Sequence, residues 1–164
     1  MLVIEDEPVW DSLAIAETVA ERFAEKQLWP AEPKARAHAR SICAEMHSGF
    51  QALRGQMPMN IRKRYPGKGL TAESQRDIDR VTAIWTHCRE RFGSGGPLVF
   101  GHFTIADAYY APVVMRFQTY AVTLPPAAQA YCEAVLSLKA VREWIEGAQR
   151  ESEVVAEDEP YARK

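Results

Sequence analysis

The sequence lacks the features that mark several large classes of protein. None of its apolar runs approaches the roughly 20 residues that span a bilayer, and it does not begin with the basic and apolar regions of a signal peptide. A basic excess is also missing, because 20 lysines and arginines stand against 22 aspartates and glutamates, for a net charge of −2. We therefore expect a protein that binds neither membranes nor nucleic acid.

Cysteine is scarce and badly placed for either a disulfide framework or a zinc site. Cys43, Cys88 and Cys132 are odd in number, lie far apart and form no CxxC pair. This usage predicts reduced thiols in a cytoplasmic protein. Each is better interpreted as a small core side chain than as a nucleophile. The histidines also lack the spacing of metal ligands, so we expect no metal.

What is present is an ordinary globular composition, with 47% hydrophobic and 26% charged residues among 164. Residues 1–10 contain two short β-rich runs around a polar turn, which predicts a hairpin. Two strands alone are only marginally stable in water. A hairpin at this point therefore calls for sheet neighbours that this sequence does not contain.

From residue 11 onward, apolar residues recur at helical spacing, which predicts an all-α fold. The expected helices cover residues 11–27, 33–57 and 72–92, begin again near 104 and 126, and finish with residues 140–149. The longest stripe, which Pro58 is expected to end, consists of Ile42, Met46, Phe50, Leu53 and Met57. The tail after residue 151 is acidic and poor in large apolar side chains, so we expect it to be frayed.

Thr104 and Asp107 stand three positions apart at the start of an apolar helical pattern. This spacing resembles a capping box, in which the side chain of each residue bonds the backbone amide of the other. A catalytic acid at Asp107 is the alternative, but a structural cap explains the spacing without any chemistry.

Four segments in order resemble the glutathione transferase family. WDSLAI (residues 10–15) is similar to its motif for the γ-glutamyl end of glutathione, and LWP (28–30) to the connection between its two domains. AEMHSGFQALRGQMPMN (44–60) resembles the first long helix of the helical domain in a bacterial subgroup. FGHFTIADAYYAPV (100–113) is similar to the capped, buried central helix.

The resemblance implies two parts. Residues 1–27 would end a thioredoxin-like domain, and residues 28–164 would form the glutathione-transferase C-terminal helical bundle of five to six helices. It also implies that Asp11 and Ser12 bind glutathione as a substrate. The chemistry of these residues agrees, because a helix N-terminus and a hydroxyl favour a carboxylate, and an aspartate favours an ammonium group. An ordinary helix N-cap is the alternative for both.

The helical half would then supply the pocket for a small hydrophobic electrophile. Its candidate residues are Met46, His47, Phe50, Tyr109 and Arg116. For His47 a surface or core position is the alternative, and tyrosines such as Tyr109 are more often packing aromatics. Arg54 is a further candidate for binding an anion.

A complete family member has a preceding βαβ unit, which carries the residue beside the glutathione sulfur and a cis-proline. The resemblance places both upstream of Met1, because Met1 stands where the strand that follows this proline should already be under way. We therefore expect no catalytic residue within this chain and negligible activity from the chain alone. A truncated sequence and a natural remnant that starts at Met1 both remain open.

The family also implies a homodimer. A function of another class is the alternative, namely a non-catalytic helical module for protein interaction or apolar-ligand binding.

Overall fold

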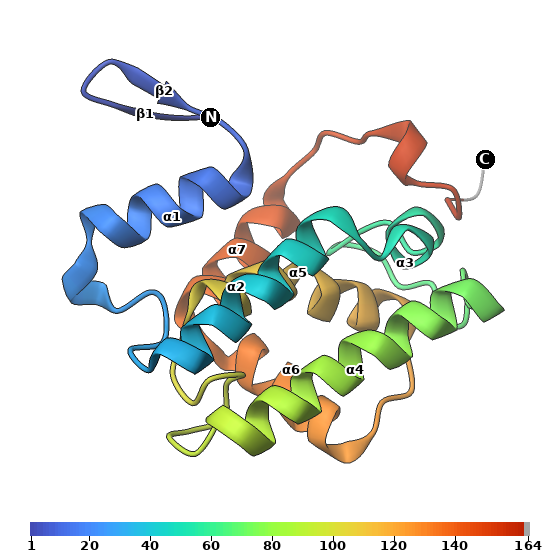
Figure 1. Ribbon diagram of the computed structural model, residues 1–164. Coiled ribbons are helices and arrows are strands. Elements are labelled where there is room, and N and C mark those ends of the chain that lie inside the picture. The colour runs from blue at the N-terminus through green and yellow to red at the C-terminus, as the bar shows by residue number, and fades with distance from the viewer. Residues whose placement is uncertain (163–164) are drawn as a thin grey trace.

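The structure, a computed structural model, describes residues 1–162, and within that range it is a β-hairpin followed by seven α-helices (Figure 1). The last two residues of the expected helical domain, 163 and 164, lie outside the described residues. The elements are β1 (Leu2–Ile4), β2 (Glu7–Val9), α1 (Ser12–Arg22), α2 (Pro33–Ser48), α3 (Gln51–Gln56), α4 (Ala72–Phe92), α5 (Ile105–Tyr120), α6 (Pro126–Ser137) and α7 (Lys139–Arg150), with 3₁₀ turns η1 (Ala24–Lys26) and η2 (Ala156–Asp158). The predicted fold class, a helical bundle preceded by a hairpin, is confirmed.

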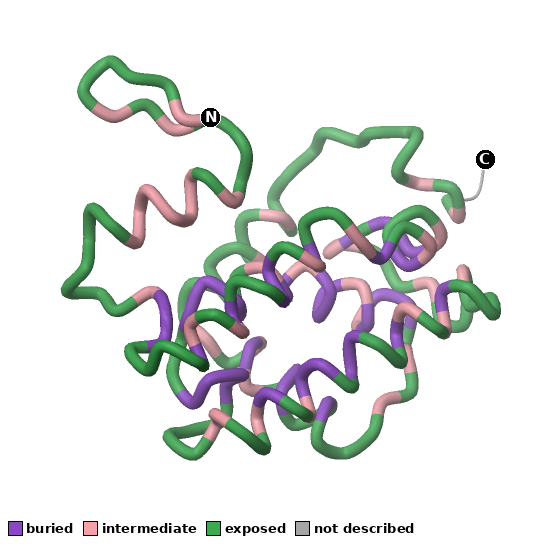
Figure 2. The backbone as a smooth tube through the Cα atoms, in the orientation of Figure 1, coloured by how far each residue is buried: buried purple, intermediate pink, exposed green. Residues whose placement is uncertain are grey.

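The hairpin closes through a tight turn in which Glu5 and Asp6 both have positive φ, of 51° and 69°. Two such residues are typical of a type I′ turn, whose twist matches that of the strands. The hairpin and α1 project from the bundle, and neither contains a buried residue (Figure 2). They are therefore weakly anchored compared with the helices behind them.

Polar contacts of Glu17 attach the middle of α1 to the bundle. The carboxylate of Glu17 accepts hydrogen bonds from the indole of Trp29 at 3.2 Å and from Nε and Nη2 of Arg40 at 2.7 and 3.0 Å. Arg40 lies on α2, so the pair fixes the position of α1 against that helix. Leu13, Ala16 and Ala20 add partly buried apolar contact with the core.

Helix α5 is the centre of the bundle, and it is apolar around most of its circumference, as a helix enclosed by others must be. It packs against α2 on one side and α6 on another. Trp85 of α4 is fully buried, with its ring 5.7 Å from Tyr110, 5.6 Å from Phe117 and 4.6 Å from Tyr131. These aromatic contacts join α4, α5 and α6 in one core.

The three cysteines are buried in this core, as predicted. Burial raises the pKa of each thiol to about 12. The thiols are therefore protonated at neutral pH and unsuited to nucleophilic attack.

The prediction of a single long helix over residues 33–57 was wrong, because the helix is interrupted between α2 and α3. Gly49 is extended and Phe50 adopts the left-handed conformation, with φ of 58°. All five residues of the predicted stripe are nevertheless buried. The new helix start is stabilised from α4, where the carboxylate of Asp77 accepts the backbone N–H of Leu53 at 2.9 Å.

The prediction of a frayed tail after residue 151 was also wrong. The guanidinium of Arg62 donates to the carbonyls of Glu151 and Glu153, and the hydroxyl of Tyr161 donates to the Gln56 carbonyl at 2.8 Å. In Figure 1 the tail arches from α7 back toward α3. Hydrogen bonds with residues far away in the sequence hold a segment whose own composition is unfavourable for packing.

Candidate functional site

The start of α5 is held by a buried carboxylate. Asp107 is 1% exposed, and its Oδ2 accepts the backbone N–H of Thr104 at 2.8 Å, so the helix carries the capping box that the spacing predicts. The Thr104 hydroxyl donates to the same oxygen at 3.1 Å. Sequence reasoning missed that Oδ1 also accepts from the Val99 amide and the Tyr131 hydroxyl, both at 3.2 Å.

In each of these contacts the neighbouring N–H or O–H group donates to the Asp107 carboxylate. Burial raises the pKa of Asp107, and the hydrogen bonds from Thr104, Val99 and Tyr131 oppose that rise. The arrangement is that of a structural cap that joins α5 to α6 and to the loop before it. It gives no support to a catalytic acid at this position.

Asp11 and Ser12 lie at the N-terminus of α1. Asp11 has φ of 70° and ψ of 131°, an uncommon conformation for a residue other than glycine, and its Oδ1 accepts the Leu13 amide at 2.8 Å. Its Oδ2 lies 3.1 Å from Nε2 of His47, on α2. The N-cap interpretation therefore holds for Asp11, while the His47 contact is one that the sequence did not predict.

Ser12 connects three elements. Its Oγ lies 3.4 Å from Nδ1 of His47, and it accepts the hydroxyl of Tyr109, on α5, at 3.3 Å. Both contacts of the imidazole are satisfied when its proton is on Nε2, so that Nε2–H donates to Asp11 and Nδ1 accepts from Ser12. A chain of hydrogen bonds then runs from Tyr109 through Ser12 and His47 to Asp11.

Beside this chain lies a pocket of about 340 Å³ between the N-terminus of α1, α2, α3 and α5. Six of the residues singled out from the sequence line it, together with two others: Ser12, Met46, His47, Arg54, Tyr109 and Arg116, with Ala108 and Pro112. Phe50 is not among these lining residues and is instead buried in the core. Its expected contact with the electrophile is therefore not supported by the geometry.

The sequence analysis predicts that the catalytic residue lies upstream of Met1. In the structure Met1 lies at the start of the hairpin and outside the pocket. Its side chain is 87% exposed, and those of Val3 and Trp10 are also exposed. The hairpin thus leaves large apolar side chains uncovered, as expected of two strands without sheet neighbours. The position of the catalytic residue upstream of Met1 stays a prediction.

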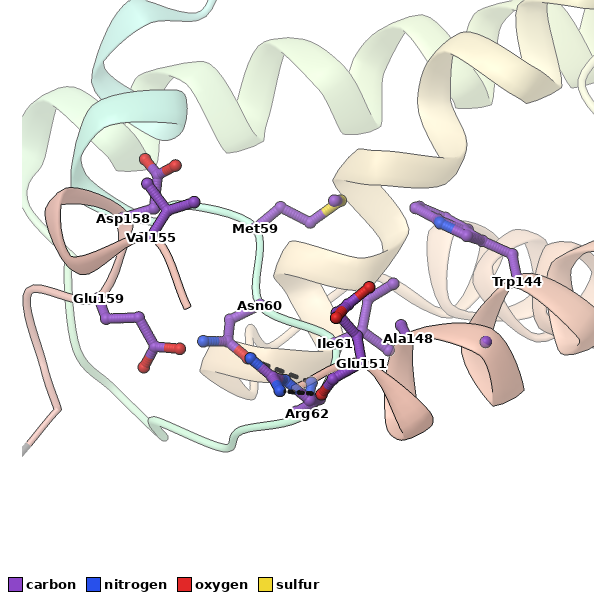
Figure 3. Close-up of a pocket in the computed structure, with 11 residues that line it drawn as sticks. Met59, Asn60, Ile61, Arg62, Trp144, Ala148, Glu151, Val155, Asp158 and Glu159 are labelled. Atoms are coloured by element: carbon purple, nitrogen blue, oxygen red, sulfur yellow. Dashed lines mark hydrogen bonds between the residues drawn. The ribbon is translucent and has the colours of Figure 1, made fainter. Parts of the chain in front are cut away.

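Two of the larger cavities lie elsewhere. One, of about 460 Å³, is enclosed by α7, the segment from Met59 to Arg62 and the tail, with Trp144 at one end and Asp158 and Glu159 at the other (Figure 3). It exists because the tail docks, which the sequence did not reveal. The other, of about 470 Å³, is an almost wholly apolar groove between α5 and α7 that includes Phe103 and Leu138.

Comparison with known proteins agrees with this architecture. Residues 71–147 match the family described as glutathione S-transferase, C-terminal domain. Over 125 residues the chain is 29% identical to a probable maleylacetoacetate isomerase of Caenorhabditis elegans, an alignment that covers 76% of this chain and 58% of that protein. The chain is therefore similar to glutathione S-transferases, most clearly over the helical residues 71–147.

A solved structure shows the same fold. The crystal structure of a glutathione transferase homologue from Burkholderia BGR1, with bound glutathione, superposes with a TM-score of 0.64 at 23% identity. The superposition covers 90% of this chain and 71% of the Burkholderia protein. This chain therefore spans only part of the length of these relatives.

Two features are absent from the described part of the chain. Over residues 1–162, no group of three or more histidine, cysteine, aspartate or glutamate side chains is placed to hold a metal ion. Across the same residues, no helix has the length and apolar character needed to cross a membrane.

Proposed function

We propose that this chain takes part in glutathione transfer to a small electrophile, with Asp11 and Ser12 binding the γ-glutamyl end of glutathione. Support comes chiefly from Ser12, which stands at the N-terminus of a helix and also lines the pocket. In this proposal residues 1–27 act as the end of a glutathione-binding domain and residues 28–164 as the electrophile-binding domain. The residue that activates the sulfur would lie upstream of Met1, and two such chains would pair in a homodimer.

The γ-glutamyl end of glutathione carries both an ammonium and a carboxylate. The first amides of α1 and the Ser12 hydroxyl suit the carboxylate, because helix N-termini present unpaired N–H groups. The Asp11 carboxylate suits the ammonium, in competition with the imidazole of His47 that it now contacts at 3.1 Å. Positive φ at Asp11 is a strained conformation of the kind that is maintained at binding sites.

In the transfer reaction the glutathione thiol loses its proton, and the thiolate attacks the electrophilic atom. The wall of Met46, Ala108 and Pro112 offers apolar contact to that electrophile. Burial raises the pKa of Tyr109, so its hydroxyl remains a hydrogen-bond donor at neutral pH. The role of this chain is thus to position both substrates and to exclude water.

Isothermal titration of the chain with millimolar glutathione tests the proposal. We expect Ser12→Ala and Asp11→Asn each to weaken binding about tenfold, the effect of losing one hydrogen bond to a charged group. Ser137→Ala is the matched control, because among residues 1–162 the Ser137 hydroxyl bonds only the Ala134 carbonyl on α6. Failure of the wild-type chain to bind glutathione would favour the non-catalytic helical module instead.

A further inference from the structure

Two guanidinium groups face the pocket beside Ser12, one from Arg54 on α3 and one from Arg116 on α5. Nη1 of Arg116 donates to the carbonyl of Pro112 at 3.1 Å. Its Nε is buried and has no hydrogen-bond partner among residues 1–162. Nη1 of Arg54 donates to the last carbonyls of α2, those of Met46 and His47, at 3.2 and 3.1 Å.

Neither arginine has a counter-charge in the pocket. No aspartate or glutamate lines it, and within the described part of the chain neither guanidinium lies in an ion pair. Burial and the nearby charge of Arg54 lower the pKa of Arg116 to about 10, and the charges of Tyr120 and Asp158 oppose this fall only in part. A partly buried cation with a buried, unsatisfied N–H and a like charge beside it destabilises the fold until an anion occupies the site.

We propose that the electrophile carries a carboxylate, bound by Arg116 and Arg54, with its apolar part against Met46, Ala108 and Pro112. A guanidinium presents a planar fork of donors that matches the two oxygens of a carboxylate, and such bonds are stronger than those between neutral groups. The apolar wall then holds the carbon skeleton close to Ser12. This inference rests on the proposed function and names the class of its second substrate.

A pair of isosteric probes separates charge from shape. 4-(Trifluoromethyl)benzoate and 4-(trifluoromethyl)benzamide differ in the carboxylate alone, and fluorine NMR reports the binding of each to the full chain. We expect the acid to bind the wild-type chain about tenfold more tightly than the amide. Arg116→Gln and Arg54→Gln should each remove most of that preference and leave the affinity for the amide unchanged.

Arg89→Gln is the matched control, because Arg89 also donates to a backbone carbonyl, that of Ala127 at 2.7 Å, but does not line the pocket. It should retain the preference for the acid. Arg116→Lys keeps the positive charge but lacks the planar fork of N–H donors, so we expect it to retain only part of the preference for the acid over the amide. A thermal unfolding curve for each variant separates loss of binding from loss of folding.

Equal affinity for acid and amide in the wild-type chain would overturn the inference. The inference would also be overturned if glutathione displaced the acid and if Arg116→Gln weakened glutathione binding as much as acid binding. The arginines would then bind a carboxylate of glutathione itself. Retention of acid binding at saturating glutathione supports a separate electrophile site. The glutathione titration of the Ser12 and Asp11 variants uses neither probe, so the proposed function and this inference can fail independently.

Discussion

The hydroxyl of Tyr131 donates to Oδ1 of Asp107 over 3.2 Å, which ties α6 to the first turn of α5 inside the core. Asp107→Ala removes the acceptor for this hydroxyl and for the amides of Val99 and Thr104. We expect it to lower the free energy of unfolding by about 3 kcal/mol or more, because buried donors are left unsatisfied. Urea unfolding at neutral pH measures this change.

Tyr131→Phe is the comparison for that prediction. It removes one donor and leaves Asp107 bonded to Thr104 and Val99, so we expect a loss of only about 1 kcal/mol. Equal losses for the two variants would mean that Asp107 stabilises the fold through Tyr131 alone and does not cap α5.

The break between α2 and α3 predicts opposite effects at two glycines. A Cβ at Gly49 would lie 2.6 Å from the carbonyl oxygen of Glu45, whereas a Cβ at Gly55 meets nothing within 4 Å. Gly49→Ala should therefore destabilise the chain by about 1–3 kcal/mol. Gly55→Ala, inside α3, should stabilise it by up to about 1 kcal/mol. Thermal unfolding of both variants checks the sign of each change.

The attachment of α1 predicts a dependence on pH. The Arg40 guanidinium, which donates to the Glu17 carboxylate, lowers the pKa of that carboxyl below its usual 4.5. A lowered pKa in the folded state means that this stabilisation is complete above the unfolded value of 4.5 and is lost as pH falls through the folded value. Because both side chains are partly exposed, we expect it to be worth no more than about 1 kcal/mol.

Urea unfolding of Glu17→Gln at pH 7 and pH 3.5 tests this prediction. The variant should be less stable than the wild-type chain at pH 7 and should approach it at pH 3.5. Glu25→Gln is the control, because among residues 1–162 the Glu25 carboxylate is in no ion pair. A constant difference between Glu17→Gln and wild type at both pH values would show that the Glu17 charge does not hold α1.

Local pattern was sufficient for features that depend on neighbouring residues. The spacing of apolar residues predicted α4, which spans Ala72–Phe92, and the Thr104 and Asp107 pair predicted where α5 begins. It could not predict the break at Phe50, because the Asp77 carboxylate that stabilises the new helix start is 24 residues from the Leu53 amide it accepts. Docking of the tail depends in the same way on Arg62, far from it in sequence.

The candidate site shows the same limit. Family resemblance brought forward Ser12, His47, Tyr109 and Arg116, and the structure places all four around one pocket. The contact between His47 and Asp11 and the orphaned Nε of Arg116 were not predicted, because both depend on how α1, α2 and α5 meet. The spacing of residues along one helix does not reveal which side chains of another helix face it.

One titration tests the central claim most directly, namely that glutathione binds at the start of α1, beside the wall formed by α2 and α5. The ¹⁵N-labelled chain is titrated with glutathione while its amide resonances are followed. We predict saturable shifts at residues 11–13, His47 and Tyr109, with α4 and α6 unaffected. Shifts confined to the cavity beneath the tail, or none at residues 11–13 at saturation, would contradict the account.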